Sequence, residues 1–145
     1  MTTPPAISDA EWEVMNVLWD AGPQSLSAAE VVDRIAASNN WSPRTVKTLL
    51  NRLIKKGALT FTRDGKSYLY RPAVRREQCV RAVSRSFLWR VFGGNVAPML
   101  AHFVTHAELS AEEVDQLQRL LHEKRAPADA AAAAAAADKP HRPTH

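Results

Sequence analysis

The chain has 145 residues, of which 46% are hydrophobic and 23% charged, and this composition suits a soluble globular protein with one or two small domains. Its single cysteine, Cys79, excludes an intramolecular disulfide and a multi-cysteine metal cage. No apolar stretch approaches the roughly 20 residues that span a bilayer, and the N-terminus lacks the pattern of a signal peptide. We therefore expect a cytoplasmic protein with no direct membrane insertion.

The net charge of +4 is distributed unevenly along the chain. Residues 1–40 hold one arginine against six acidic residues, whereas residues 41–90 hold 13 lysine and arginine residues against two acidic ones. Residues 91–145 return to a slight acidic excess. Because a basic segment is the electrostatic footprint of many nucleic-acid-binding proteins, the middle third of the chain is the first candidate for function.

Two helices are predicted before the basic segment. The Ser-x-x-Glu pattern of a capping box occurs at residues 8–11 and 27–30, where it predicts helix starts. Apolar residues then recur at helical spacing, and the helices are expected over residues 9–20 and 28–38. Their apolar positions are Trp12, Met15, Leu18 and Trp19 in the first helix, and Val31, Val32 and Ile35 in the second.

A third helix is predicted between Trp41 and Gly57, and it carries an apolar face and a basic face. Ser42 followed by Pro43 is typical of an N-cap and a first helical position, and Gly57 after two lysines is typical of a helix end. No acidic residue occurs from Trp41 to Arg63, whereas solvated surface helices normally interleave both signs. The apolar face consists of Val46, Leu49, Leu50, Leu53 and Ile54.

The basic face predicts a contact with DNA rather than with solvent alone. In a helix-turn-helix, the second helix of the motif enters the major groove, and its N-terminal half reaches base edges. That half provides the candidate base-reading residues Arg44, Thr45, Lys47 and Thr48. The candidate phosphate contacts are Ser42, Asn51, Arg52, Lys55, Arg63 and Lys66.

A β-hairpin is predicted after the basic helix. Two short β-rich stretches, 58–62 and 67–71, lie on either side of Asp64-Gly65, a dipeptide that favours a two-residue turn between strands. Three helices followed by a hairpin is the element order of a winged helix-turn-helix module. We therefore predict such a DNA-binding domain over residues 1–72.

The predicted hairpin carries two basic residues at its tip and two tyrosines in its second strand. Arg63 and Lys66 at its tip suit a contact with DNA, and they suit a solvated turn equally well. Tyr68 and Tyr70 alternate like core-facing strand residues, so we expect both to pack in the core, in the vicinity of Trp12.

Three further helices are predicted over residues 73–92, 96–106 and 111–124. A segment this small has little core of its own, so we expect residues 73–125 to form a helical dimerisation domain in a homodimer. From residue 126 the sequence is rich in alanine and has no apolar stripe, and a disordered tail is expected over 126–145. The expected interface residues are Val83, Phe87, Val91, Met99, Leu100, Phe103, Val114, Leu117, Leu120 and Leu121.

Neither a metal site nor a catalytic site is predicted. His102 and His106 have ligand spacing on a helix, but two histidines without a third ligand are more often incidental. Cys79 lies in an apolar-periodic helix with no histidine nearby, and the sequence contains neither a glycine-rich phosphate loop nor an H-E-x-x-H motif. We expect a protein that is not an enzyme and that uses no cofactor.

Three motifs resemble the BlaI/MecI/CopY family of bacterial repressors, also called the penicillinase repressor family. They are ISDAEWEVMNVLW at 7–19, WSPRTVKTLLNRLIKKG at 41–57 and the sequence Tyr68-Leu69-Tyr70, and the looser match covers about residues 6–125. The resemblance implies a winged helix followed by a three-helix dimerisation domain, in a chain that is mainly α with a small β-hairpin wing. It also implies that a dimer binds a pseudo-palindromic operator of the TACA/TGTA type and blocks transcription.

The resemblance further suggests how repression ends. In the penicillinase branch, a membrane-bound sensor protease system triggers cleavage of the repressor in the dimerisation domain, commonly at an Asn-Phe pair. The matching segment here is Ala101-His102-Phe103, in which Phe103 matches the pair and His102 departs from it. CopY-like members sense copper through a C-terminal cysteine cluster, and this chain has none.

The sequence therefore predicts a homodimeric, DNA-binding transcriptional repressor that controls a resistance or stress operon. Two alternatives remain open. One is a ligand-sensing winged-helix regulator, for which the sequence offers no convergent polar pocket. The other is a winged-helix interaction module that does not bind DNA and whose basic face is solvated.

Overall fold

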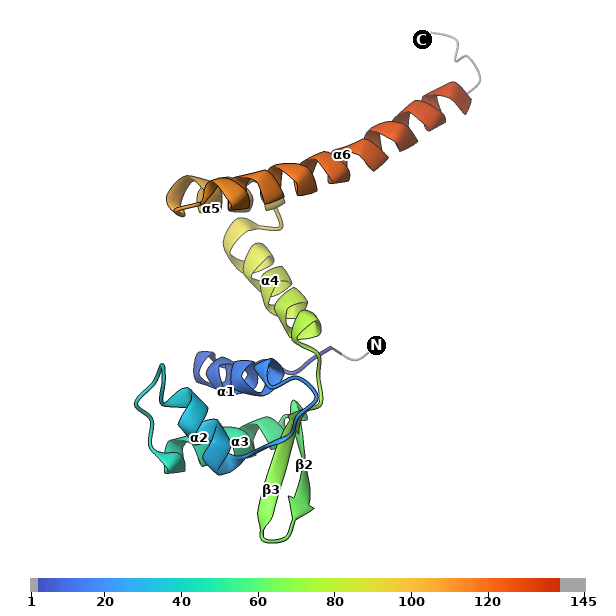
Figure 1. Cartoon of the computed structure of the whole chain (residues 1–145). Helices are drawn as coiled ribbons and strands as arrows, with labels where there is room; N and C mark the ends of the chain where they lie inside the picture. The colour runs from blue at the N-terminus through green and yellow to red at the C-terminus, as the bar shows by residue number, and fades with distance from the viewer. Residues whose placement is uncertain (1–2, 139–145) are drawn as a thin grey trace. The chain divides into compact units, whose positions relative to one another are not determined.

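The computed structural model describes the backbone of residues 3–138 and the side chains of residues 3–126. The chain divides into two compact units, Met1–Asn95 and Val96–His145 (Figure 1). The first unit contains four helices and the sheet, so the fold is mainly α with a small β-sheet. The elements of the first unit are α1 (Asp9–Asp20), β1 (Leu26–Ser27), α2 (Ala28–Ile35), α3 (Pro43–Lys55), β2 (Leu59–Asp64), β3 (Ser67–Pro72) and α4 (Arg76–Phe92).

The predicted capping boxes start α1 and α2. The Ser8 hydroxyl accepts from the Glu11 amide while the Glu11 carboxylate accepts from the Ser8 amide, and Ser27 and Glu30 repeat the pattern. The predicted bounds of the first helix are confirmed. The second helix ends at Ile35 rather than at 38, because the following amides close turns onto the carbonyls of Val32 and Ile35.

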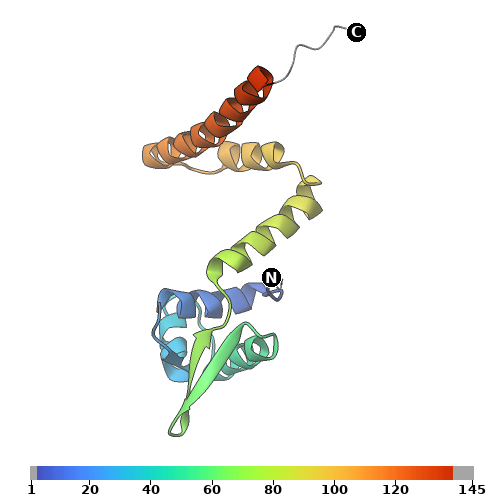
Figure 2. The same ribbon diagram turned by 90° about the vertical axis from the view of Figure 1, so that its right-hand side faces the viewer.

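The sheet has three antiparallel strands in the order β1-β3-β2. The hairpin of β2 and β3 extends beyond the helices of the first unit as a wing (Figure 2). Its two-residue loop is Gly65-Lys66, one residue later than the predicted Asp64-Gly65, because Asp64 still pairs with Ser67. Among the described residues only glycines have positive φ, and Gly65 at +65° supplies it at the first loop position, as a type II′ turn requires.

The core of the first unit lies between the three N-terminal helices and the sheet. Tyr70 is buried there as predicted, but Tyr68 is 41% exposed, so its predicted core position is wrong. Tyr68 lies further out on the wing, where its ring packs against Phe61 at 4.7 Å between centroids. Trp12 packs against Trp19 at 5.5 Å. The buried apolar residues are Val14, Met15, Leu18, Leu26, Val31, Ile35, Val46, Leu49, Leu50, Leu53, Ala58, Leu59 and Tyr70.

Helix α4 belongs to the first compact unit, although its sequence pattern groups it with the later helices. It starts at Arg76 rather than at 73, where the Gln78 side chain accepts from the Arg75 amide. The indole N–H of Trp19 donates to the Val74 carbonyl at 3.0 Å, which ties the segment before α4 to α1. Whether residues 73–125 act together as one dimerisation domain stays a prediction.

The second unit consists of α5 (Val96–His106) and α6 (Ala111–Asp138). A third Ser-x-x-Glu capping box, formed by Ser110 and Glu113, lies at the start of α6. The alanine-rich stretch continues this helix to Asp138, because alanine has the highest helix propensity of all residues. The expected disorder from residue 126 is therefore wrong for residues 126–138. The rest of the expected tail, 139–145, lies outside the described residues.

Most of the apolar side chains of α5 and α6 are exposed. No residue of α5 is buried, and every described side chain of α6 is exposed. Within residues 3–138, no helix is both long and apolar enough to cross a membrane.

Candidate nucleic-acid interface

Helix α3 is positioned by its own cap and by its apolar face. The Ser42 hydroxyl accepts from the Thr45 amide at 3.2 Å, and Pro43 fills the first helical position. Four apolar side chains, Val46, Leu49, Leu50 and Leu53, are buried against the rest of the first unit. Burial of this face orients the opposite face of α3 toward solvent.

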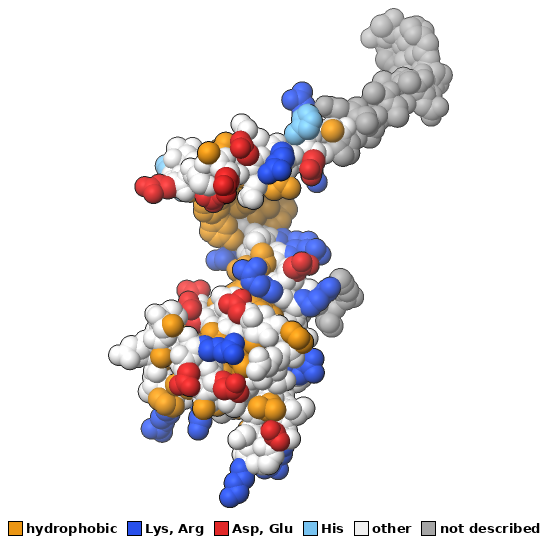
Figure 3. Space-filling model, viewed as in Figure 1, with side chains coloured by type: hydrophobic (Ala, Val, Ile, Leu, Met, Phe, Trp, Pro, Cys, Tyr) orange, Lys and Arg blue, Asp and Glu red, His pale blue; other side chains and the backbone are white. Residues whose placement is uncertain are grey.

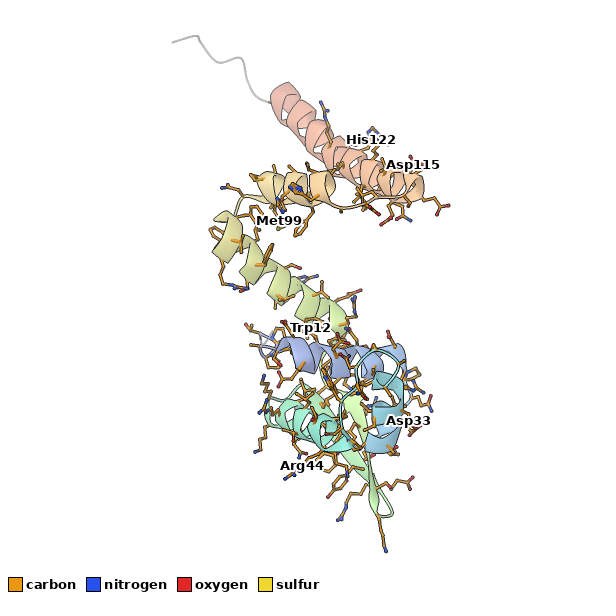
Figure 4. The ribbon with its side chains drawn as sticks, turned by 90° about the vertical axis from the view of Figure 1, so that its left-hand side faces the viewer. Trp12, Asp33, Arg44, Met99, Asp115 and His122 are labelled. Atoms are coloured by element: carbon orange, nitrogen blue, oxygen red, sulfur yellow. The ribbon has the colours of Figure 1, made fainter. Side chains whose placement is uncertain are left out.

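The solvent-facing side of α3 collects the predicted contact residues. Figure 4 shows Arg44 on the outer side of α3, pointing away from the helical core. The only ion pair among the described side chains joins Lys56 to Glu11, so the cations of this face pair with no carboxylate of the described chain. The exposed residues on this side are Arg44, Thr45, Lys47, Thr48, Asn51, Arg52 and Lys55.

Two of the predicted base-reading hydroxyls are already engaged locally. The Thr48 hydroxyl donates to the Arg44 carbonyl at 3.0 Å. The Thr45 hydroxyl lies 3.1 Å from that of Ser42, which also serves as the N-cap acceptor. Because these bonds occupy the hydroxyl groups, the methyl groups of Thr45 and Thr48 are the parts best suited to contact a base, such as a thymine methyl.

A groove of about 740 Å³ runs between α2, α3 and the wing. It brings together three of the predicted residues, Lys47 and Asn51 from α3 and Lys66 from the hairpin loop. In Figure 3, several Lys and Arg side chains lie along the lower edge of the first unit and at the end of the wing. The other predicted residues do not line the groove, and all of them are exposed: Ser42, Arg44, Thr45, Thr48, Arg52, Lys55 and Arg63.

The wing carries an exposed aromatic and cationic surface. The Arg63 guanidinium lies 5.5 Å from the centre of the Tyr68 ring, which in turn packs on Phe61. Arg63 and Lys66 are both exposed near the hairpin loop. The Arg63 side chain thus lies against the Tyr68 ring on the wing, whereas Lys66, in the hairpin loop, lines the groove.

The sequence did not indicate the contribution of α2 to this groove. Ser27, Ala28 and Ala29 line it at the N-terminus of α2, where the amides of the first turn have no partner within a helix. The capping box at Ser27 was the available signal, because it located this positively polarised helix end. Tyr68 was also missed as a groove residue, since its alternation with Tyr70 indicated the core.

Lys56, the residue after α3, is engaged in an ion pair with α1. Its ammonium group donates to the Glu11 carboxylate and to the Ala6 carbonyl, the latter at 3.0 Å. Glu11 is only 1% exposed, and its burial acts to raise the pKa. Hydrogen bonds from Lys56 and Ser8 outweigh burial and hold the pKa of Glu11 below its ordinary value of 4.5.

Replacing Glu11 with glutamine is expected to cost about 1–3 kcal/mol of folding stability at pH 7, because the buried partner of Lys56 loses its charge. A carboxyl group whose pKa is lowered by folding stabilises the protein above its unfolded pKa and loses this effect as the pH falls through the folded pKa. The difference between wild type and Glu11→Gln should therefore shrink below about pH 4.5. Urea unfolding at pH 7 and pH 3 measures both values.

The matched control is Glu13→Gln, which neutralises an exposed carboxylate on the same helix. Its effect should stay within about 0.5 kcal/mol at both pH values. A loss for Glu11→Gln that is equal at pH 7 and pH 3 would contradict the role of the charge.

Among the described residues, no group of three or more histidine, cysteine, aspartate or glutamate side chains is placed to hold a metal ion. The rings of His102 and His106 lie 4.4 Å apart on α5, and within residues 3–126 no third histidine, cysteine or carboxylate completes a metal site with them. The bond between His102 and Phe103, the candidate cleavage site, lies inside α5, so it is helical in this structure.

Comparisons with known proteins agree with the resemblance of the sequence to the BlaI/MecI/CopY repressors. The family model described as "Penicillinase repressor" matches residues 7–123. A penicillinase repressor from Bacillus licheniformis is 39% identical over 119 residues, which are 82% of this chain and 91% of that protein. The methicillin resistance regulatory protein MecI from Staphylococcus aureus strain N315 is 34% identical over 118 residues, or 81% of this chain and 94% of that protein.

Solved structures of related repressors cover about half of this chain. The solution structure of the DNA-binding domain of the repressor BlaI is 41% identical, covers 54% of this chain and 93% of that chain, and has a TM-score of 0.47. A monomeric form of Bacillus licheniformis BlaI in complex with the blaP half-operator gives the same identity and coverage with a TM-score of 0.46. The family model and the relatives span most of this chain, and the family consists of regulators rather than enzymes. The chain therefore belongs to the penicillinase repressor family.

Proposed function

We propose that this chain, a DNA-binding transcriptional repressor by family, acts as a homodimer on a pseudo-palindromic operator. The observation that carries the proposal is the exposed face of α3, whose cations pair with no described carboxylate and which lies beside a groove shared with the wing. We place its action in the cytoplasm, where the bacterial chromosome lies, and we assign it to a resistance or stress operon.

In the proposed complex α3 enters the major groove with its N-terminal half against the bases. Arg44 and Lys47 donate to guanine or other base acceptors, and the methyl groups of Thr45 and Thr48 contact thymine. The phosphate backbone is bound by the remaining residues of the interface. These are Ser42, Asn51, Arg52 and Lys55 around α3, with Arg63 and Lys66 on the wing.

Exposed apolar side chains on α4, α5 and α6 support the homodimer. Eight of the ten predicted interface residues are more than a third exposed, from Val114 at 37% to Leu121 at 62%. Trp89, at 65%, extends the set and was not predicted from the sequence. So much exposed apolar surface on three helices is typical of an interface, and a second copy would cover it with matching helices.

Separation of the two copies would relieve repression. Tight operator binding needs both copies, so any signal that separates them lowers occupancy. A membrane sensor protease system that cuts the chain between His102 and Phe103 would act in this way. Since proteases bind an extended chain, such a cut requires α5 to unfold locally first.

Operator affinity is expected to fall steeply with salt, and this dependence tests the DNA-binding face. Four cations per copy are assigned to phosphates, namely Arg52, Lys55, Arg63 and Lys66, so eight contacts predict a slope of about −7 in log affinity against log salt. Lys55→Ala should reduce the slope by about 2, because the substitution occurs in both copies. Fluorescence anisotropy with operator DNA, selected from random sequence, measures it.

The control is Arg81→Ala, which removes an exposed cation from α4 and should leave the slope unchanged. A slope near zero, or no DNA binding at low salt, would contradict the proposal. Either result would favour an interaction module whose basic face is solvated.

A further inference from the structure

A second cavity, of about 310 Å³, lies within the first unit and away from the DNA-binding face. It is lined by the N-terminal segment before α1, by α1 itself and by α4 from Cys79 to Arg90. Figure 4 labels Trp12 at the side of α1 that faces α4, and this ring forms one wall. The size falls in the range of small-molecule sites.

The lining combines an apolar interior with one cationic edge. Ile7, Trp12, Cys79 and Val83 supply apolar surface. Cys79 is buried, and desolvation raises the pKa of its thiol, so this part of the wall stays uncharged. Val83, which the sequence assigns to the dimer interface, lines this cavity as well.

The polar groups of the cavity are Ser86 and Arg90, one helical turn apart on α4. The Arg90 Nε donates to the Ser86 hydroxyl at 3.1 Å, which orients the guanidinium along the cavity edge. Arg90 has no ion pair with a carboxylate of the described residues. Its terminal N–H groups therefore form a planar fork that suits a carboxylate.

We propose that this cavity binds a small carboxylic acid with an apolar body of about one ring, its carboxylate on Arg90 and Ser86 and its body against Trp12. The single positive charge at the edge selects an anion, because no described acidic residue lines the cavity. The apolar wall selects a hydrocarbon body over a polar one.

The contacts around the cavity connect it to the DNA-reading helix. Ala6, in the N-terminal wall, accepts a hydrogen bond from Lys56, the residue that follows α3. Trp12 packs on Trp19, which holds the segment before α4 through Val74. A ligand that moves either wall therefore acts on the end of α3 or on the start of α4, and this consequence rests on the proposed DNA-binding function.

Phenylacetate is a suitable probe, with 2-phenylethanol as its uncharged counterpart. Isothermal titration of the full-length protein should give a dissociation constant on the order of 1 mM for phenylacetate and about tenfold weaker binding for phenylethanol. Arg90→Gln should weaken phenylacetate binding about tenfold and leave phenylethanol binding unchanged. Arg85→Gln removes an exposed α4 cation that does not line the cavity and is the control for charge.

A second variant and a site-specific readout complete the test. Ala82 lines the cavity, so Ala82→Phe should block both probes, with circular dichroism as the check on folding. Phenylacetate should also slow the reaction of Cys79, the single thiol of the chain, with a small thiol reagent. No binding at about 10 mM, or equal loss in Arg90→Gln and Arg85→Gln, would overturn the proposal. None of these measurements uses DNA, so they are independent of the operator experiments.

Discussion

Replacing Arg44 with alanine is expected to weaken operator binding by about 2–6 kcal/mol, because one base contact is worth about 1–3 kcal/mol and a homodimer loses it twice. Specificity should relax at one base pair in each half-site. Arg44 is exposed on the N-terminal half of α3, and no described carboxylate pairs with it. Anisotropy titrations against the operator and against single-base variants of it measure both effects.

Two further variants separate a base contact from a general charge effect. Arg44→Lys keeps the charge but not the planar fork, so it should lose most of the specificity while binding random DNA as well as wild type. Arg52→Ala should weaken binding to operator and to random DNA by the same factor. Equal losses on both DNAs for Arg44→Ala would show that Arg44 contacts phosphate.

Helix α3 could be predicted from sequence because all its signals are local. Its N-cap, its first-turn proline and its apolar spacing lie within 17 residues of chain. The same holds for the three capping boxes, whose hydrogen bonds join residues three positions apart. The exposed face of α3 could be predicted as well, because burial of one face of a helix leaves the opposite face in solvent.

Features that depend on distant parts of the chain were not predictable in this way. Strand β1 has two residues and no pattern of its own, and it exists because Leu26 pairs with Tyr70. Tyr68 and Tyr70 have the same spacing signal, yet only Tyr70 lies where the helices cover the sheet. The local pattern predicts which side of the strand a side chain lies on, but it does not predict how far the helices cover that side.

The same limit applies to the candidate site. Lys56 follows directly after Lys55 in sequence, and only packing against Glu11, 45 residues earlier, distinguishes a structural cation from a DNA-binding one. The groove at Lys47 and Lys66 likewise required the fold, because it joins α2, α3 and the wing. Charge composition located the basic segment but could not assign each cation to a partner.

Introducing a charge on the apolar side of α6 should dissociate the homodimer and thereby reduce operator affinity. Leu121 is 62% exposed and follows Val114 and Leu117 at helical spacing, so Leu121→Glu places a carboxylate in the proposed interface of both copies. Loss of the buried leucine and desolvation of the new charge should each cost a few kcal/mol. We expect a monomer in sedimentation equilibrium at micromolar concentration and operator affinity more than about 100-fold lower.

Binding to a single half-site separates this effect from damage to the reading domain. A monomer retains α3 and the wing, so Leu121→Glu should bind half-site DNA as well as wild type. Ala126→Glu adds the same charge to α6 at an exposed position on the side away from the apolar residues, and it should remain dimeric. If Leu121→Glu stays dimeric, then α6 lies outside the interface. If it loses half-site binding to the same extent as operator binding, then the substitution impairs DNA binding by each copy, and dissociation of the dimer is not the cause of the lost operator affinity.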